Sequence, residues 1–344
     1  SFDEPNDPNR GDVHYWEVWH GNKPFSEYRK YFFRYASEFG FQSFPSVKTL
    51  ETVTDDPKEL NPFSYVMEKH QRNYGGNGKI AKYMQAAYRY PENFSDFVYA
   101  SQLLQADGIR YGVEHYRRNR GRCMGAIYWQ LNDCWPVISW SSIDYYGRWK
   151  ALHYYAKRFF APVMLSCEEQ SWMTVEADMN RQHFEFEKSI RLNVTNETLD
   201  AHRVLVKWAV RKTDATILRE EEQWLEVPAL SAVWMDKVEL PQIDCFNEYV
   251  SYEAWENDQI ISQGTVIFSY PKYFRYLNPG LTVRVDGDEI VVKAEAYAKS
   301  VEIRNENDDL ILEDNYFDMN AGEYRVKILD GKPDGLKVRS VYDI

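Results

Sequence analysis

An acidic side chain stands inside an aromatic run near the start of the chain. Glu38 lies in the segment FFRYASEFGFQSFP, residues 32–45, in which phenylalanine recurs. A carboxylate drawn toward an apolar interior costs free energy unless a partner or a reaction uses it. A buried ion pair with an arginine such as Arg34 is the structural explanation, and a catalytic carboxylate is the functional one.

A second stretch combines an aromatic ring with polar side chains. In YWQLNDCW, Trp129 is followed by Gln130, Asn132 and Asp133. Functional groups in parallel α/β folds gather where strands end, so a carboxylate and a Trp at neighbouring strand ends predict a sugar site. Aromatic faces stack on sugar C–H groups, and a carboxylate stabilises the oxocarbenium-like state of glycoside hydrolysis. Core packing is the alternative for Trp129.

The elements that carry these residues have an α/β pattern. Apolar residues recur every three to four positions over 94–118, which predicts an amphipathic helix. The apolar runs at 31–41 and 123–131 predict buried strands of a parallel sheet. Residues 147–160 predict a further helix that ends before Pro162.

From about residue 163 the pattern becomes all-β. Alternating segments predict strands of a sandwich, and a proline-containing break at 269–280 predicts a linker before a second β unit. The sequence VDGDE at 285–289 predicts a hairpin turn. Trp224 and Trp234 are expected in the sandwich core. The expected strands are 172–179, 189–196, 202–210, 248–255 and 261–268, followed by 281–285, 289–296, 300–305, 324–329 and 336–341.

Composition excludes several classes of function. The chain has 344 residues and a net charge of −12, which disfavours binding to nucleic acid or to an anionic membrane. No apolar run reaches the roughly 20 residues that cross a bilayer. The histidines and cysteines are dispersed, so neither a metal nor another cofactor is expected. The polar opening without Met suggests that the chain begins inside a larger protein.

Three segments closely resemble the β-mannosidases of glycoside hydrolase family 2. They are DVHYWEVWHG at 12–21, SEFGFQSFPSVKTL at 37–50, and the stretch from YRRNRGRCMGAIYWQLNDCW to KRFFAP at 116–162. The run DNYFDMNAGEYRV at 314–326 resembles the last immunoglobulin-like domain of the same enzymes.

The resemblance implies a multidomain fold, α/β followed by all-β. Residues 1–162 would form the C-terminal part of a (β/α)8 TIM barrel, with barrel strands seven and eight and their helices. Residues 163–270 and 271–344 would form two immunoglobulin-like β-sandwich domains. Two strands cannot close a barrel, so residues 1–160 are expected to be ordered only against the preceding barrel strands.

The resemblance also implies a retaining exo-β-mannosidase that removes terminal β-D-mannose by double displacement. It assigns the nucleophile to Glu38, the sugar-stacking ring to Trp129, and pocket-lining roles to Trp16 and Tyr15. The family's acid/base Glu belongs to an earlier strand that this chain lacks, so the chain alone is expected to be inactive. The implied partners are β-mannoside oligosaccharides or glycoconjugates and the upstream part of the same enzyme. The cytoplasm is favoured if the source is bacterial.

Two other functions remain open from the sequence. The same scaffold serves other family 2 specificities, such as β-galactosidase or β-glucuronidase. The sandwiches and the missing acid would also suit a non-catalytic carbohydrate-binding or structural module.

Overall fold

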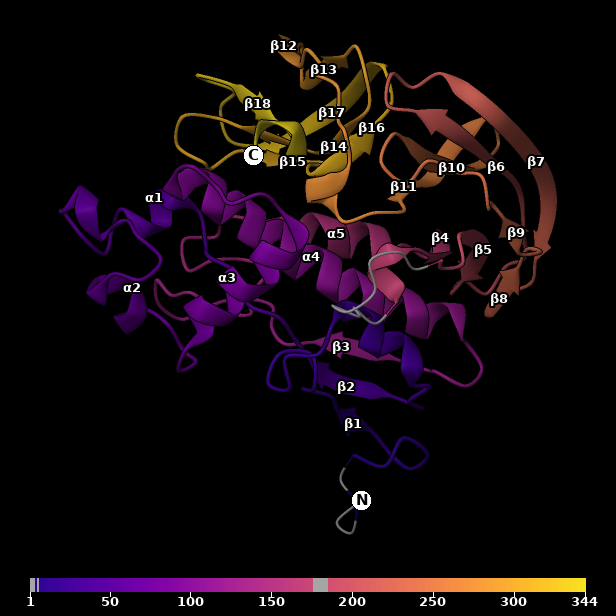
Figure 1. Ribbon diagram of the computed structural model, residues 1–344, viewed down its shortest axis with the longest axis horizontal. Helices are drawn as coiled ribbons and strands as arrows, with labels where there is room; N and C mark the ends of the chain where they lie inside the picture. Colours follow the sequence, from indigo (N-terminus) through magenta and orange to yellow (C-terminus); the bar gives the residue numbers. More distant parts are fainter. Residues whose placement is uncertain (1–3, 5, 176–184) are drawn as a thin grey trace.

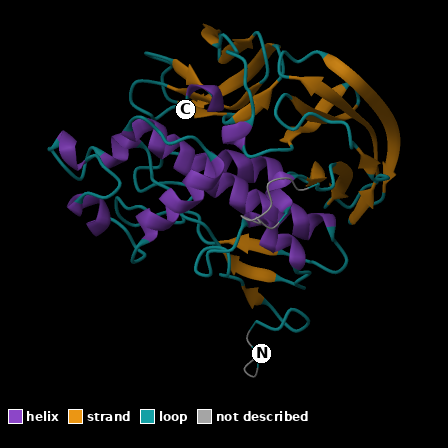
Figure 2. Ribbon diagram, in the orientation of Figure 1, coloured by secondary structure: helices purple, strands orange, loops and turns teal. Residues whose placement is uncertain are grey.

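A computed structural model describes residue 4, residues 6–175 and residues 185–344. Along the chain, a helical region with a small parallel sheet is followed by two β-sandwiches (Figure 1). The long helices form a middle layer, with the parallel sheet on one side and the sandwiches on the other (Figure 2). The change from α/β to all-β falls where the sequence predicts it.

The small sheet contains three parallel strands in the order β1-β2-β3. They are β1 (Val13–His14), β2 (Ala36–Phe39) and β3 (Ala126–Tyr128). The two predicted strands are confirmed, and β1 is an addition, since two residues are too few to give a periodic pattern. The prediction that β3 is buried is wrong for one face, because Ile127 is 51% exposed.

Helix α4 (Phe94–Arg118) confirms the predicted helix from end to end. It begins at Asn93, whose side chain accepts the backbone N–H of Asp96 and caps the first turn. At Gly112 an added Cβ would lie 2.8 Å from the ring of Phe39, so glycine lets the helix approach β2 closely. The other helical elements here are α5 (Ala151–Phe159), which is also predicted, α3 (Gly76–Ala87), α1 (Val47–Leu50), α2 (Tyr65–Lys69), η1 (Phe25–Lys30) and η2 (Pro57–Glu59).

The first sandwich packs two sheets around one apolar core. One sheet holds β4 (Val163–Gln170), β5 (Ser189–Asn196), β8 (Ser231–Trp234) and β9 (Val238–Glu239). The other holds β6 (His202–Lys212), β7 (Ile217–Val227), β10 (Glu248–Glu256) and β11 (Gln259–Ile267). The four strands predicted between 189 and 268 are confirmed.

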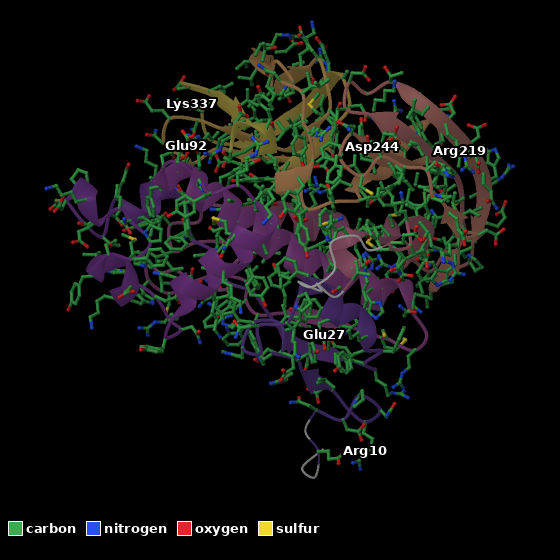
Figure 3. All side chains as sticks on the ribbon, in the orientation of Figure 1. Arg10, Glu27, Glu92, Arg219, Asp244 and Lys337 are labelled. Carbon is green, nitrogen blue, oxygen red and sulfur yellow. The ribbon has the colours of Figure 1, made fainter. Side chains whose placement is uncertain are left out.

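Two predictions about the first sandwich are wrong. The described part of the strand expected at 172–179 contains the 3-10 turn η3 (Trp172–Thr174), and residues 176–179 lie outside the described residues. Trp224 is 54% exposed on the edge strand β7, which also carries Arg219 (Figure 3). The Arg203 guanidinium covers the Trp224 ring at 4.5 Å, and Arg191 covers the half-buried Trp234 at 4.6 Å.

The second sandwich follows the turn η4 (Pro271–Tyr273). Its first sheet holds β12 (Thr282–Asp286), β13 (Glu289–Ala294), β17 (Gly322–Asp330) and β15 (Ile311–Leu312). Its second sheet holds β16 (Phe317–Met319), β14 (Ala298–Arg304) and β18 (Lys337–Arg339), and η5 (Val341–Asp343) ends the chain. The predicted strands are confirmed, and so is the β12–β13 hairpin, in which Gly287 takes a positive φ of 67°.

The second sandwich shares one continuous apolar core with the helical region. The Tyr99 hydroxyl of α4 donates to the carbonyl of Ser300 at 2.5 Å, and Arg339 pairs with Asp96 at 2.9 Å. The first sandwich has its own core and is tied to the helical region by the Arg29–Glu169 ion pair. None of the helices in the described part of the chain has the length and apolar character needed to cross a bilayer.

Candidate active site

The residues singled out in the sequence meet at one edge of the parallel sheet. His14 of β1 is in register with Glu38 of β2, and Phe39 is in register with Tyr128 of β3. Because all three strands are parallel, their carboxyl ends lie at the same edge, which is where α/β proteins place their sites. Trp129 follows β3 directly, at this edge.

The Glu38 carboxylate is held by an indole rather than by an arginine. The Trp16 indole Nε1–H donates to Glu38 Oε1 at 2.8 Å, while His14 Nδ1 lies 3.7 Å from Oε2. The Glu38 side chain keeps 24% exposure, so it remains partly accessible to solvent. Arg34 is exposed and forms no ion pair with Glu38 among the described residues, so the structural explanation for this acid does not hold.

Trp129 is placed beside strand β2 by its backbone. Its N–H donates to the carbonyl of Phe39 at 2.7 Å, so it sits next to the residue that follows Glu38. Its side chain is 45% exposed, so core packing does not account for the ring. The ring is therefore available as an aromatic platform at the sheet edge.

The side chain of Tyr15 points away from the side to which His14 and Trp16 point. Its N–H donates to the Glu38 carbonyl at 2.7 Å, but its ring is buried against Tyr31 and Phe33, each at 5.1 Å. The side chains of His14 and Trp16 reach the carboxylate, while that of Tyr15 points into an aromatic core. Its role in sugar binding stays a prediction.

Three tryptophans, Trp129, Trp140 and Trp16, lie very close to Gly40. A Cβ at this position would lie 2.5 Å from the Trp129 carbonyl oxygen and 3.0 Å from both Trp140 and Trp16. The ring of Trp140 also packs edge-on against Trp16 at 6.1 Å. Sequence analysis missed Trp140, because it stands in the segment VISWSS, which has no motif of its own.

Other features of the described chain lie apart from this edge. A cavity of about 550 Å³ opens between η1, α4 and β11, and none of the candidate residues lines it. Within residues 6–175 and 185–344, no three His, Cys, Asp or Glu side chains gather as a metal site. The chemistry available at the sheet edge is therefore that of a half-buried carboxylate beside the exposed ring of Trp129 and the half-buried rings of Trp16 and Trp140.

Two family models match the second half of the chain. The Mannosidase Ig/CBM-like domain matches residues 188–273, and an Ig-fold domain matches residues 276–344. The two matches fall on the two sandwiches, which are therefore immunoglobulin-like.

The curated proteins to which the chain is similar include several that are named β-mannosidase. The chain is 29% identical over 361 aligned positions to β-mannosidase B of Thermothelomyces thermophilus, covering 96% of this chain and 41% of that protein. It is 37% identical over 173 positions to β-mannosidase of Capra hircus, covering 46% of this chain and 19% of the relative. The chain spans about 40% of the length of the curated relatives that it matches along almost its whole length.

Solved structures share the fold. The crystal structure of β-D-mannosidase from Dictyoglomus thermophilum aligns with a TM-score of 0.84 at 27% identity, over 98% of this chain and 41% of that chain. An exo-chitosanase from Amycolatopsis orientalis aligns with a TM-score of 0.61 at 17% identity, over 89% of this chain and 42% of that chain. The latter likeness concerns the fold alone.

Proposed function

Since this chain corresponds to the C-terminal portion of the β-mannosidases of glycoside hydrolase family 2, we propose that it supplies the nucleophile half of a retaining exo-β-mannosidase site. The observation that carries this proposal is the Glu38 carboxylate, held by the Trp16 indole at the edge of a parallel sheet beside Trp129.

Glu38 is the proposed nucleophile. Its Oε2 attacks the anomeric carbon of a terminal β-mannosyl unit, and the bond to the leaving oxygen breaks as an acid protonates that oxygen. The resulting glycosyl ester is then hydrolysed by a water that gives up its proton to the same group, now acting as base. The Trp16 N–H on Oε1 leaves Oε2 as the attacking oxygen.

The neighbouring aromatic residues have different proposed parts. The exposed Trp129 ring stacks on the mannosyl unit, where its face also stabilises developing positive charge. Trp16 orients the nucleophile through its indole. Tyr15 contributes by supporting the strand end from the core side, since its backbone N–H holds the Glu38 carbonyl.

We place the missing acid/base outside this chain. The sheet β1-β2-β3 is proposed to be one side of a (β/α)8 barrel within residues 1–162, with the two immunoglobulin-like domains at 163–270 and 271–344. The substrates are then β-mannoside oligosaccharides or glycoconjugates, and the isolated 344-residue chain is inactive because it holds the nucleophile without its acid.

The test is made on the full-length protein with nitrophenyl β-mannoside. Glu38→Gln should lower kcat by a factor on the order of 10⁴, because the amide cannot form the glycosyl ester. A 2-fluoro-mannosyl reagent should label Glu38, as found by peptide mass mapping. Glu92→Gln, which changes an exposed acid on the loop before α4, is the matched control and should retain full activity (Figure 3). Labelling of a different acid would overturn the assignment.

Specificity is tested with the same protein. Rates on nitrophenyl β-galactoside and β-glucuronide should be far below the rate on the β-mannoside. A preference for either of the other two sugars would replace mannosidase by that specificity while leaving the role of Glu38 in place.

A further inference from the structure

A buried lysine lies beneath the candidate site. Lys150 precedes helix α5 and is only 1% exposed. Its Nζ lies 3.2 Å from Ser43 Oγ and 3.4 Å from each of the backbone carbonyl oxygens of Ser43 and Ser139. The ammonium therefore donates to oxygens of two different chain segments.

These two segments are the loops that carry the site residues. Ser43 follows β2 and Glu38, whereas Ser139 belongs to the loop that starts at Trp129. The loops pair directly, since the N–H of Ser43 donates to the Ser139 carbonyl at 3.0 Å. Lys150 thus joins the loop behind the nucleophile to the loop behind the sugar platform at their point of contact.

A buried carboxylate organises the second of these loops. Asp133 accepts hydrogen bonds from the hydroxyls of Ser139 at 2.7 Å and Ser141 at 2.5 Å. It also accepts the side-chain amide of Gln130, the residue after Trp129, at 3.3 Å. One carboxylate therefore fixes both ends of the segment from Gln130 to Ser141 in relation to each other.

Two buried carboxylates accompany Lys150 beneath the loops. Lys150, Asp133 and Asp144 are all buried, and the two carboxylates lie close enough to favour the charged ammonium. Apolar residues of similar size usually give equal or greater stability than such a buried charged set. The buried charged set is therefore weak evidence for added stability, and it suits a role in holding a defined loop geometry.

We infer that Lys150 and Asp133 are positioning residues that set the place of Trp129 relative to Glu38. This inference rests on the proposed function, because it assigns them a part in the same mannoside-binding site. Neither side chain touches the substrate. Both act through Trp129, so removing Trp129 should remove most of their effect on catalysis.

The experiment is a double-mutant cycle in the full-length protein. Lys150→Met should lower kcat/KM for nitrophenyl β-mannoside about tenfold in the wild-type background and less than about twofold when Trp129 is already alanine. Lys299→Met is the matched control, since Lys299 is also buried and paired with Asp318 at 3.3 Å, but in the second sandwich. Its effect should be equal in both backgrounds.

A second readout does not need activity. In the full-length protein without substrate, Lys150→Met should speed amide hydrogen exchange in peptides covering 129–142, and Lys299→Met should not. Independent effects of Lys150→Met and Trp129→Ala on kcat/KM, together with unchanged exchange, would overturn the inference. Should Lys150→Met fail to fold, Asp133→Asn takes its place in both measurements, with the same outcomes.

The two proposals fail in distinguishable ways. A full-length wild-type protein without mannosidase activity would sink the proposed function. The exchange measurement would still decide whether Lys150 holds the Trp129 loop, because it needs neither substrate nor activity.

Discussion

A single added methyl group at Gly40 should damage the site through packing alone. The alanine Cβ would lie 2.5 Å from the carbonyl oxygen of Trp129, whereas ordinary contacts begin at 3.4 Å. The carbonyl must therefore retreat by about 0.9 Å. It cannot do so freely, because the N–H of the same residue is bonded to the Phe39 carbonyl at 2.7 Å. The rings of Trp16 and Trp140, each 3.0 Å from the new Cβ, close the other directions.

The size of the effect follows from that displacement. Overpacking of this kind typically costs about 1–3 kcal/mol of the free energy of unfolding. A misplacement of about 1 Å at a catalytic centre lowers the rate by up to about a hundredfold. Gly40→Ala should therefore reduce kcat/KM for nitrophenyl β-mannoside about 10- to 100-fold, because Glu38 and Trp129 are pushed apart.

The assay pairs kinetics with urea unfolding, both measured on the full-length protein. The control is Gly78→Ala in helix α3, where an added Cβ meets no atom within 4 Å and φ is not positive. That variant should keep wild-type activity and gain up to about 1 kcal/mol of stability, since alanine favours helix over glycine. Wild-type kcat/KM for Gly40→Ala would refute the argument that these three aromatic residues meet at Gly40.

Three further outcomes are expected. Trp16→Phe keeps an aromatic ring but loses the N–H that donates to Glu38 Oε1. The kcat/KM of the full-length protein should therefore fall about tenfold. An unchanged kcat/KM would show that the indole does not orient the Glu38 carboxylate. Burial, opposed by two nearby carboxylates, lowers the pKa of Lys150 to about 8 from 10.5, so between these pH values the unfolded chain holds a proton that the folded chain has released. The unfolding free energy of the wild type minus that of Lys150→Met should therefore rise with pH over this window, by on the order of 3 kcal/mol. A difference in urea-unfolding free energy that does not change with pH would contradict this. Glu169→Gln breaks the buried ion pair with Arg29, whose Nη2 lies 2.7 Å away. The loss of the pair should cost about 3–5 kcal/mol of unfolding free energy, measured by urea unfolding. A loss below about 1 kcal/mol would mean that the pair does not hold the first sandwich in place.

Local patterns in the sequence predicted helices α4 and α5, strands β2 and β3 and nine strands of the two sandwiches. They did not predict helices α1 to α3 or strands β1, β4, β7, β8, β9, β15 and β16. Helix α4 is predicted to its end residues because apolar residues recur every three to four positions along it, and the structure adds the Asn93 cap at its first turn. The strands of both sandwiches are predicted where apolar residues alternate. Strand β7 is missed because ILREEEQWLEV lies at a sheet edge and is exposed along most of its length, so no buried face marks it.

The site could be predicted only in part. Glu38 stands out because it is an acid within an apolar strand, a signal that any local reading detects. Its partner Trp16 is 22 positions away in sequence, and the hydrogen bond exists only once β1 pairs with β2. The roles of Gly40 and Trp140 depend on packing between loops that follow different strands. No spacing rule in one sequence encodes such contacts.

Helix α4 connects the sandwiches to the proposed chemistry. On one side, Gly112 lies against Phe39, and the Gln105 amide donates to the carbonyls of Phe41 and Trp140, each at 2.9 Å. On the other side, Tyr99 bonds to the second sandwich and Tyr111 bonds to Glu169 of the first.

The sandwiches therefore brace helix α4, which packs against strand β2 and its Glu38. This arrangement favours a supporting role for them over that of independent sugar-binding modules. The exposed Trp of the first sandwich, Trp224, already has one face covered by Arg203. The immunoglobulin-like domains would then act on hydrolysis through α4, by fixing the strand that holds Glu38, rather than through contact with the sugar.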